Sequence, residues 1–192
     1  DWSSAVCSSD LVYLIVTGMV RATAFSSGGR QVTYRDIPAG DWFGDFSAID
    51  GQARSADIVA ASETLVASMS PAVFLQLVHD HPSVFDHMLL RLVTSVRELT
   101  ERIFEFSTLG VENRVHAELL RLARQSGIVK NSSRLEPAPK HADIAAQVST
   151  YREQVTRELS RMFKQKLLVK DGGALIVPDV ARLAELVAAV RR

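Results

Sequence analysis

Residues 140–163 read Lys-His-Ala-Asp-Ile-Ala-Ala-Gln-Val-Ser-Thr-Tyr-Arg-Glu-Gln-Val-Thr-Arg-Glu-Leu-Ser-Arg-Met-Phe, and their spacing predicts two short helices separated by a tight turn. The apolar residues of the first helix are Ile144, Ala145 and Val148. Those of the second are Val155, Leu159, Met162 and Phe163. Each set lies on one helical face, so both helices can share a small core. This is the layout of a helix-turn-helix that reads DNA.

The opposite face of the second helix is polar. An arginine there can bind a guanine edge bidentately, and a carboxylate can accept from cytosine. Thr150 and Glu153 also fit a capping box, in which Glu153 would bond back to the helix start and read no base. The sequence leaves both interpretations of Glu153 open. The residues that we predict to contact DNA are Ser149, Thr150, Arg152, Glu153, Thr156 and Arg157.

Charge is divided unevenly along the chain. The formal net charge of the 192 residues is zero. Before Gly110 the chain has 7 Lys and Arg against 13 Asp and Glu, a balance of −6, and from Gly110 onward it has 15 against 9, a balance of +6. A basic module joined to an acidic one indicates that the C-terminal part approaches phosphates, with binding that weakens as salt rises.

Length and composition limit the class of protein. With 47% hydrophobic residues, the chain has material for about two compact domains. No apolar run approaches the roughly 20 residues of a membrane-spanning helix, so we expect a cytoplasmic protein with no membrane partner. The single cysteine, Cys7, excludes an internal disulfide and an iron–sulfur cluster held by four cysteines of this chain.

Residues 1–10 lack any periodicity and join abruptly to a well-patterned strand. The string from Val6 to Leu11 resembles an accidentally translated sequencing adapter. We therefore interpret residues 1–10 as a doubtful, non-native segment and the chain as truncated at its N-terminus. Cys7 is assigned no function.

Three regions follow residue 10. Residues 11–82 contain short strand-like runs at 11–16, 20–25 and 31–37, with a Gly-rich turn at 26–29, which indicates an antiparallel barrel or roll. Residues 83–109 predict one long helix. Residues 110–192 form a second module, in which a two-stranded hairpin over 167–177 would be a wing and residues 180–192 a final helix.

One loop of the first region, residues 43–56, carries the groups that a cyclic phosphate needs. Gly44 offers backbone N–H groups, Arg54 and Ser55 offer a guanidinium and a hydroxyl for the phosphate, and Asp45 offers a carboxylate for a ribose hydroxyl. Each residue also has an ordinary interpretation, since Arg54 could be a solvated surface residue and Gly44 a turn glycine. Their combined order between two strands is more specific.

The long helix has an apolar repeat with spacings of 3, 4, 3, 4 and 3, typical of the a and d positions of a coiled coil. Its members are Leu89, Leu92, Val96, Leu99, Ile103 and Phe106. This seam can pack against a second copy of the helix, or against the chain's own roll. We favour the homodimer because two-fold dimers of helix-turn-helix proteins read two half-sites one helical turn apart.

Together these motifs resemble the Crp/Fnr family of bacterial transcription regulators. The resemblance rests on the strand 13–18, the Phe43-Gly44-Asp45 and Arg54-Ser55-Ala56 segments, and the Arg152-Glu153-x-x-x-Arg157 helix, in family order. It implies an α+β fold: an antiparallel cyclic-nucleotide-binding β-roll, a long dimerisation helix and a C-terminal winged helix-turn-helix. The family usually has Glu where this chain has Asp45, and its polar purine contacts correspond to Leu99 and Thr100.

The resemblance also implies a function. We expect a sequence-specific regulator controlled by a small effector, cyclic AMP or a related cyclic nucleotide, bound by Gly44, Asp45, Arg54, Ser55 and Thr100. Its expected partners are a palindromic double-stranded operator, a second copy of the chain and RNA polymerase. Two alternatives stay open: a ligand-independent DNA-binding regulator with a degenerate sensor, or a cyclic-nucleotide-binding subunit acting on a protein partner.

No pattern predicts an enzyme. The sequence has no Ser-His-Asp order, phosphate-loop lysine motif or metalloprotease helix, so we assign no catalytic residue and no catalytic cofactor. The histidines are scattered and lack Cys-pair or His-x-x-x-His spacing, so we assign no metal site.

Overall fold

The computed structural model describes residues 11–25 and 31–190, so residues 1–10 and the predicted turn at 26–29 lie outside the description. The chain divides into two compact units, Asp1–Arg97 and Glu98–Arg192. Their boundary falls inside one long helix, α3 (Pro82–Thr108). The described helices include none that combines the length and apolarity needed to cross a membrane.

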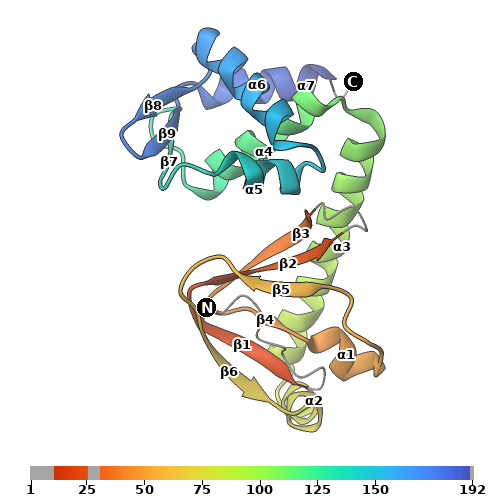
Figure 1. The fold of residues 1–192 in the computed structure, drawn as a ribbon. Coiled ribbons are helices and arrows are strands. Elements are labelled where there is room, and N and C mark those ends of the chain that lie inside the picture. Colours follow the sequence, from red (N-terminus) through yellow and green to blue (C-terminus); the bar gives the residue numbers. More distant parts are fainter. Residues whose placement is uncertain (1–10, 26–30, 191–192) are drawn as a thin grey trace. The chain divides into compact units, whose positions relative to one another are not determined.

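The described strands of the first unit form two three-stranded antiparallel sheets. Figure 1 labels these strands. The strand orders are β4-β1-β6 and β3-β2-β5. The strands are β1 (Val12–Thr17), β2 (Met19–Phe25), β3 (Gln31–Pro38), β4 (Trp42–Phe43), β5 (Asp57–Ala60) and β6 (Leu65–Met69). Because all pairings are antiparallel and side chains from both sheets are buried, the predicted antiparallel roll is confirmed.

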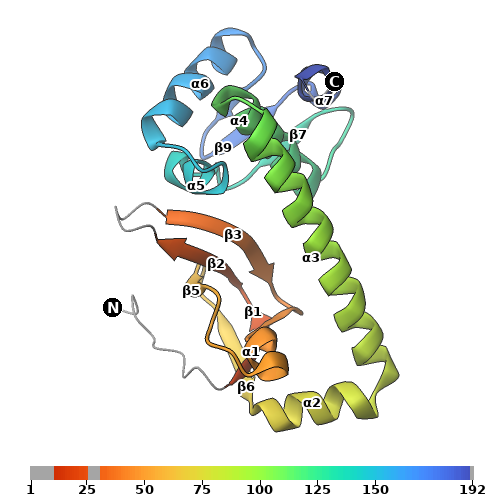
Figure 2. The same cartoon turned by 90° about the vertical axis from the view of Figure 1, so that its right-hand side faces the viewer.

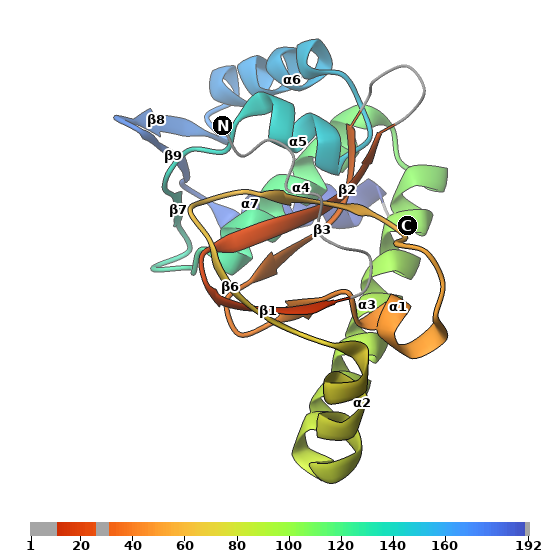
Figure 3. The same ribbon diagram turned by 60° about the horizontal axis from the view of Figure 1, so that its bottom comes forward.

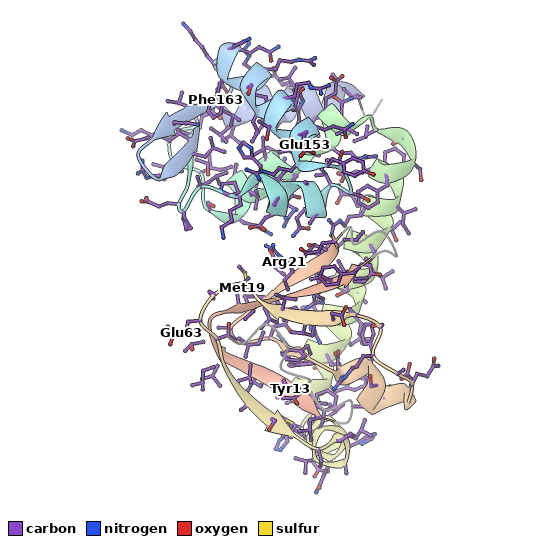
Figure 4. The ribbon with its side chains drawn as sticks, viewed as in Figure 1. Tyr13, Met19, Arg21, Glu63, Glu153 and Phe163 are labelled. Carbon is purple, nitrogen blue, oxygen red and sulfur yellow. The ribbon has the colours of Figure 1, made fainter. Side chains whose placement is uncertain are left out.

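A close backbone approach fixes the turn between β1 and β2. Gly18 has a φ of 85°, and a side chain there would overlap the carbonyl oxygen of Glu63. The next residue, Met19, donates its backbone N–H to the hydroxyl of Ser62 at 3.0 Å. Figure 4 shows Met19 and Glu63 at the same end of the roll. Glycine is needed here because other residues rarely adopt positive φ and none would fit.

Two short helices accompany these sheets. Helix α1 (Asp45–Asp50) lies within the segment predicted as a loop, so that prediction is wrong for these six residues. Helix α2 (Pro71–Asp80) begins with Ser70 accepting from the N–H of Val73, and it packs Phe74 and Val78 into the roll. In Figure 2 the chain bends sharply between α2 and α3, where extended His81 precedes Pro82. Figure 3 shows α1 and α2 with the lower end of the Figure 1 view turned forward.

The second unit is a winged helix-turn-helix built on one core. Its helices are α4 (Val111–Gln125), α5 (His141–Gln147), α6 (Arg152–Lys164) and α7 (Val180–Val190). Its strands are β7 (Ser133–Leu135), β8 (Val169–Asp171) and β9 (Ala174–Val177), in the order β7-β9-β8. The predicted helix pair and wing are therefore present, and β7 is a third strand that the sequence patterns did not reveal.

One detail of this unit differs from the predictions. Leu167 and Leu168 were expected to start the wing strand, but both are buried core residues that precede β8. The final helix does pack on this module, through Leu183 and Val187. Leu186 and Val190 of the same helix are 39% and 44% exposed.

Candidate nucleic-acid interface and effector site

The turn between α5 and α6 is held by backbone hydrogen bonds and one left-handed residue. The N–H of Thr150 donates to the carbonyl of Ala145 at 2.9 Å, and Ser149 has a φ of 52°. Helix α6 begins after Tyr151, whose side chain makes no cap. The capping-box alternative is therefore wrong: Thr150 is buried and its hydroxyl donates to the side chain of Gln154.

Four of the six predicted DNA contacts share one exposed face of α6. Arg152, Glu153, Thr156 and Arg157 are all exposed and line a surface hollow of about 660 Å³. The hollow also includes Ser160, Arg161 and Lys164, all from the same helix. Figure 4 labels Glu153 near the start of this helix and Phe163 near its end. The other two predicted contacts differ, since Ser149 is half-buried and Thr150 is buried.

The buried face of α6 fixes the direction of the exposed one. Val155, Leu159 and Met162 lie in the core of the unit. Glu158 is also buried, and its Oε1 lies at hydrogen-bond distance, 2.8 Å, from Nε2 of His116 on α4. Because these contacts hold one side of α6 against the module, the helix presents the side with Arg152 and Arg157 to solvent.

The arginines of the hollow differ in how far their charge is compensated. Arg161 lies 2.8 Å from a carboxylate oxygen of Glu112 and 3.4 Å from one of Glu158. Within residues 11–25 and 31–190, Arg152 and Arg157 have no carboxylate at ion-pair distance. Two guanidinium groups without a carboxylate partner on one exposed helix face form a surface suited to an anionic partner.

In the first unit, Gly44 and Arg54 are in direct contact. Gly44 has a φ of 91°, and a Cβ at this position would overlap Nη1 of Arg54. Nη2 of Arg54 donates to the carbonyl of Leu11. Nη1 is buried, and it has no hydrogen-bond partner among the described residues. A buried guanidinium nitrogen without an acceptor is costly, and a phosphate oxygen placed there would satisfy it.

The carboxylate of Asp45 is engaged by a residue of α3. Its side chain is buried, and Oδ2 lies 2.7 Å from Nη1 of Arg91 on α3. Nε of Arg91 lies 2.6 Å from Oδ1 of Asp41, close enough for an ion pair. The guanidinium also lies 4.9 Å from the ring centroid of Trp42. The carboxylate that we predicted to bind ribose is thus part of an ion-pair network within the fold.

This network joins two carboxylates to two arginines. Arg35 lies 2.7 Å from the second oxygen of Asp41 and donates to the hydroxyl of Ser95 on α3 at 2.8 Å. Burial lowers the pKa of Arg91, while Asp45 and Asp41 oppose that shift by favouring the charged form. The Asp41–Asp45–Arg91 contacts were not evident in the sequence, because the residues lie more than 40 positions apart.

The other two predicted effector residues are placed differently. Ser55 is exposed beside Arg54. Thr100 is an exposed residue of α3 that belongs to the second unit. The structure therefore brings Gly44 and Arg54 together and pairs Asp45 with Arg91. The roles of Ser55 and Thr100 stay predictions.

The predicted seam of α3 lies on its surface in the single chain. Over the described residues, α3 contains no buried side chain. Leu89, Val96, Leu99 and Ile103 are 50%, 62%, 47% and 66% exposed. Phe106 is 38% exposed, and Leu92 is half-buried. Phe85, which is 47% exposed and four residues before Leu89, extends the predicted repeat by one position.

The described part of the chain contains no group of three or more His, Cys, Asp or Glu side chains that could hold a metal ion.

Comparison with known proteins identifies two domains in the chain. A model of the cyclic nucleotide-binding domain matches residues 8–81, and a model of the Crp-like helix-turn-helix domain matches residues 113–186. The chain is 29% identical over 177 residues to the cyclic AMP receptor protein of Thermus thermophilus, covering 91% of this chain and 78% of that protein. It is 25% identical over 170 residues to the cAMP-activated global transcriptional regulator CRP of Pasteurella multocida, covering 88% and 81%.

Solved structures share the fold. FixK2 from Bradyrhizobium japonicum superposes with a TM-score of 0.77 at 22% identity, over 93% of this chain and 87% of that one. The c-di-GMP responsive regulator CLP of Xanthomonas campestris gives a TM-score of 0.76 at 18% identity, over 88% and 85%.

A cyclic-nucleotide-binding roll followed by a winged helix-turn-helix defines a class of two-domain transcription regulators. The chain belongs to the Crp/Fnr family within that class. It is a DNA-binding transcription regulator, in agreement with the predicted fold and function, and the relatives are regulators rather than enzymes.

Proposed function

We propose that this protein is a cytoplasmic homodimer that reads a palindromic operator through α6 and responds to a small effector held by the roll. The observation that carries the DNA-reading role is the difference between the arginines of α6. Arg161 is paired with Glu112 and Glu158, whereas Arg152 and Arg157 are exposed without a carboxylate partner among the described residues. These two side chains are available for guanine edges in the major groove.

The homodimer follows from the exposed seam of α3 and from the symmetry of DNA. An isolated helix with an apolar a/d repeat of this length gains stability by packing against a partner helix. A second copy would pair its own α3 with the first and present two α6 helices to two half-sites. RNA polymerase is the protein partner that we infer for the DNA-bound dimer.

For the effector we propose a cyclic nucleotide, cyclic AMP being the first to test. The support is the buried Nη1 of Arg54, which lacks an acceptor and lies against Gly44. A cyclic phosphate would supply the acceptor. The carboxylate that we predicted to bind a ribose hydroxyl, Asp45, is paired with Arg91. That pairing favours the alternative of a regulator that binds DNA without a ligand, or with a ligand that lacks ribose contacts.

Arg157 has no carboxylate partner among the described residues and Arg161 has two, which leads to a prediction about DNA specificity. Arg157→Ala should weaken binding to the operator by about 1–3 kcal/mol and change binding to random DNA little, because a lost base contact affects only the correct sequence. Arg161→Ala is the matched control on the same helix, and it should affect both DNAs equally and weakly. Fluorescence anisotropy on the two duplexes at one salt concentration measures this. An equal loss on both duplexes for Arg157→Ala would identify a phosphate contact instead.

The orphaned guanidinium leads to a prediction about the effector. Arg54→Ala should abolish most cyclic AMP binding in calorimetry, because the phosphate would lose a charge-assisted bidentate contact and still be desolvated. Arg54→Lys keeps the charge without the bidentate geometry and should bind with intermediate affinity. Unchanged circular dichroism would show that the roll stays folded. If the unaltered chain binds neither cyclic AMP nor cyclic GMP, the ligand-independent alternative replaces this part of the proposal.

A further inference from the structure

One side chain of the exposed α6 face is held by a residue from the neighbouring helix. Nδ1 of His141, the first residue of α5, lies 2.8 Å from Oγ1 of Thr156. The same hydroxyl donates to the backbone carbonyl of Arg152, one turn earlier in α6, at 2.9 Å. Thr156 is exposed and lines the hollow described above.

Hydrogen counting fixes the direction of these two contacts. A threonine hydroxyl has one hydrogen, and here that hydrogen goes to the Arg152 carbonyl. The hydroxyl must therefore accept from His141, whose Nδ1 carries the hydrogen. Burial, together with the positive charges of Arg152 and Lys170, lowers the pKa of His141. The neutral ring protonated on Nδ1 is accordingly the form that makes this contact at neutral pH.

The consequence concerns which part of Thr156 can meet DNA. With its only hydrogen donated within the protein, the hydroxyl has no donor left for guanine N7 or O6, adenine N7 or thymine O4. One acceptor lone pair of the hydroxyl stays available for adenine N6 or cytosine N4, and the Cγ2 methyl is the only apolar group of the side chain. In the major groove the apolar counterpart of a methyl is the C5 methyl of thymine.

We propose that Thr156 reads a thymine methyl group in each operator half-site and that His141 is the positioning residue that orients it. The proposal rests on the proposed function, since it requires α6 to lie in the major groove. It adds a specificity element to the guanine contacts of Arg152 and Arg157. It also distinguishes Thr156 from Ser160, whose hydroxyl donates to the carbonyl of Thr156 and which carries no methyl.

The test uses an operator obtained by selection from random duplexes, with each thymine of a half-site replaced in turn by deoxyuridine. The unaltered protein should lose affinity by about fourfold at one position, the value expected for one buried methyl group. Thr156→Ser keeps the hydroxyl and removes the methyl, so it should bind the thymine and deoxyuridine duplexes equally. Discrimination that survives in Thr156→Ser, or no sensitive position at all, would overturn the proposal.

A second pair of variants separates orientation from folding. His141→Ala removes the Nδ1 donor and should abolish the thymine preference, whereas His141→Asn places an amide donor near the Nδ1 position and should restore it. A purely structural role would instead change the melting temperature without changing the ratio of the two affinities. If the protein retains Arg157-dependent specificity but ignores the thymine methyl, this inference alone fails. If no operator can be selected, the proposed function fails.

Discussion

Replacing Leu99 and Ile103 by glutamate is expected to convert the proposed dimer into monomers and to lower operator affinity by about 10²–10⁴-fold. The two residues are 47% and 66% exposed in the single chain and occupy successive positions of the α3 repeat. A carboxylate on each would be buried without a partner in the helix–helix seam, which is strongly unfavourable. Operator affinity falls because the second half-site no longer binds as part of the same molecule.

Thr94→Glu provides the control for this experiment. Thr94 is an exposed residue of α3 on the side opposite the repeat, so a carboxylate there should leave the assembly unchanged. Sedimentation equilibrium gives the oligomeric state, and anisotropy on the selected operator gives the affinity. A Leu99→Glu, Ile103→Glu protein that stays dimeric with full affinity would show that α3 is not the interface.

The second large effect is expected at Arg91. Arg91→Ala should lower the free energy of unfolding of the roll by about 3–5 kcal/mol, because it leaves Asp45 buried without its cation. Arg91 also lies over Trp42, so packing against the indole is lost as well. Urea unfolding followed by tryptophan fluorescence measures the change. Both tryptophans of the sequence, Trp2 and Trp42, precede the second unit, so the signal does not come from that unit.

Arg97 supplies the matched control on the same helix. It is exposed and has no ion-pair partner among the described residues, so Arg97→Ala should change the stability by no more than about 0.5 kcal/mol. Arg91→Ala combined with Asp45→Ala removes both charges and should recover part of the loss, since no isolated buried carboxylate remains. A loss below about 1 kcal/mol for Arg91→Ala would mean that the network contributes little to the fold.

The sequence was most informative where the structure is local. The two helices of the helix-turn-helix follow from apolar spacing within 24 consecutive residues, and the exposed side of α6 follows from the same spacing. The capping-box interpretation of Glu153 failed because Tyr151, and not Thr150, is the residue that precedes the first turn of the helix. Only the structure decides between these two residues.

Features that depend on distant residues were not predictable. β7 has only three residues and is a strand because it pairs with β9, more than 35 positions later. The assignment of Asp45 to ribose rested on its place after Gly44, and no local pattern indicated that Arg91 would bind it. The orientation of Thr156 by His141 likewise depends on the angle between α5 and α6, which hydrophobic spacing does not specify.

The most direct test of the whole account is selection of binding sites from a random DNA library by the intact chain, with and without cyclic AMP. A homodimer that reads DNA through α6 should enrich a motif of two inverted half-sites whose centres lie about 10 base pairs apart, with a guanine in each half-site for the α6 arginines. Cyclic AMP should strengthen the enrichment without changing the motif. Recovery of no motif, or of an asymmetric motif with a single half-site, under both conditions would contradict it.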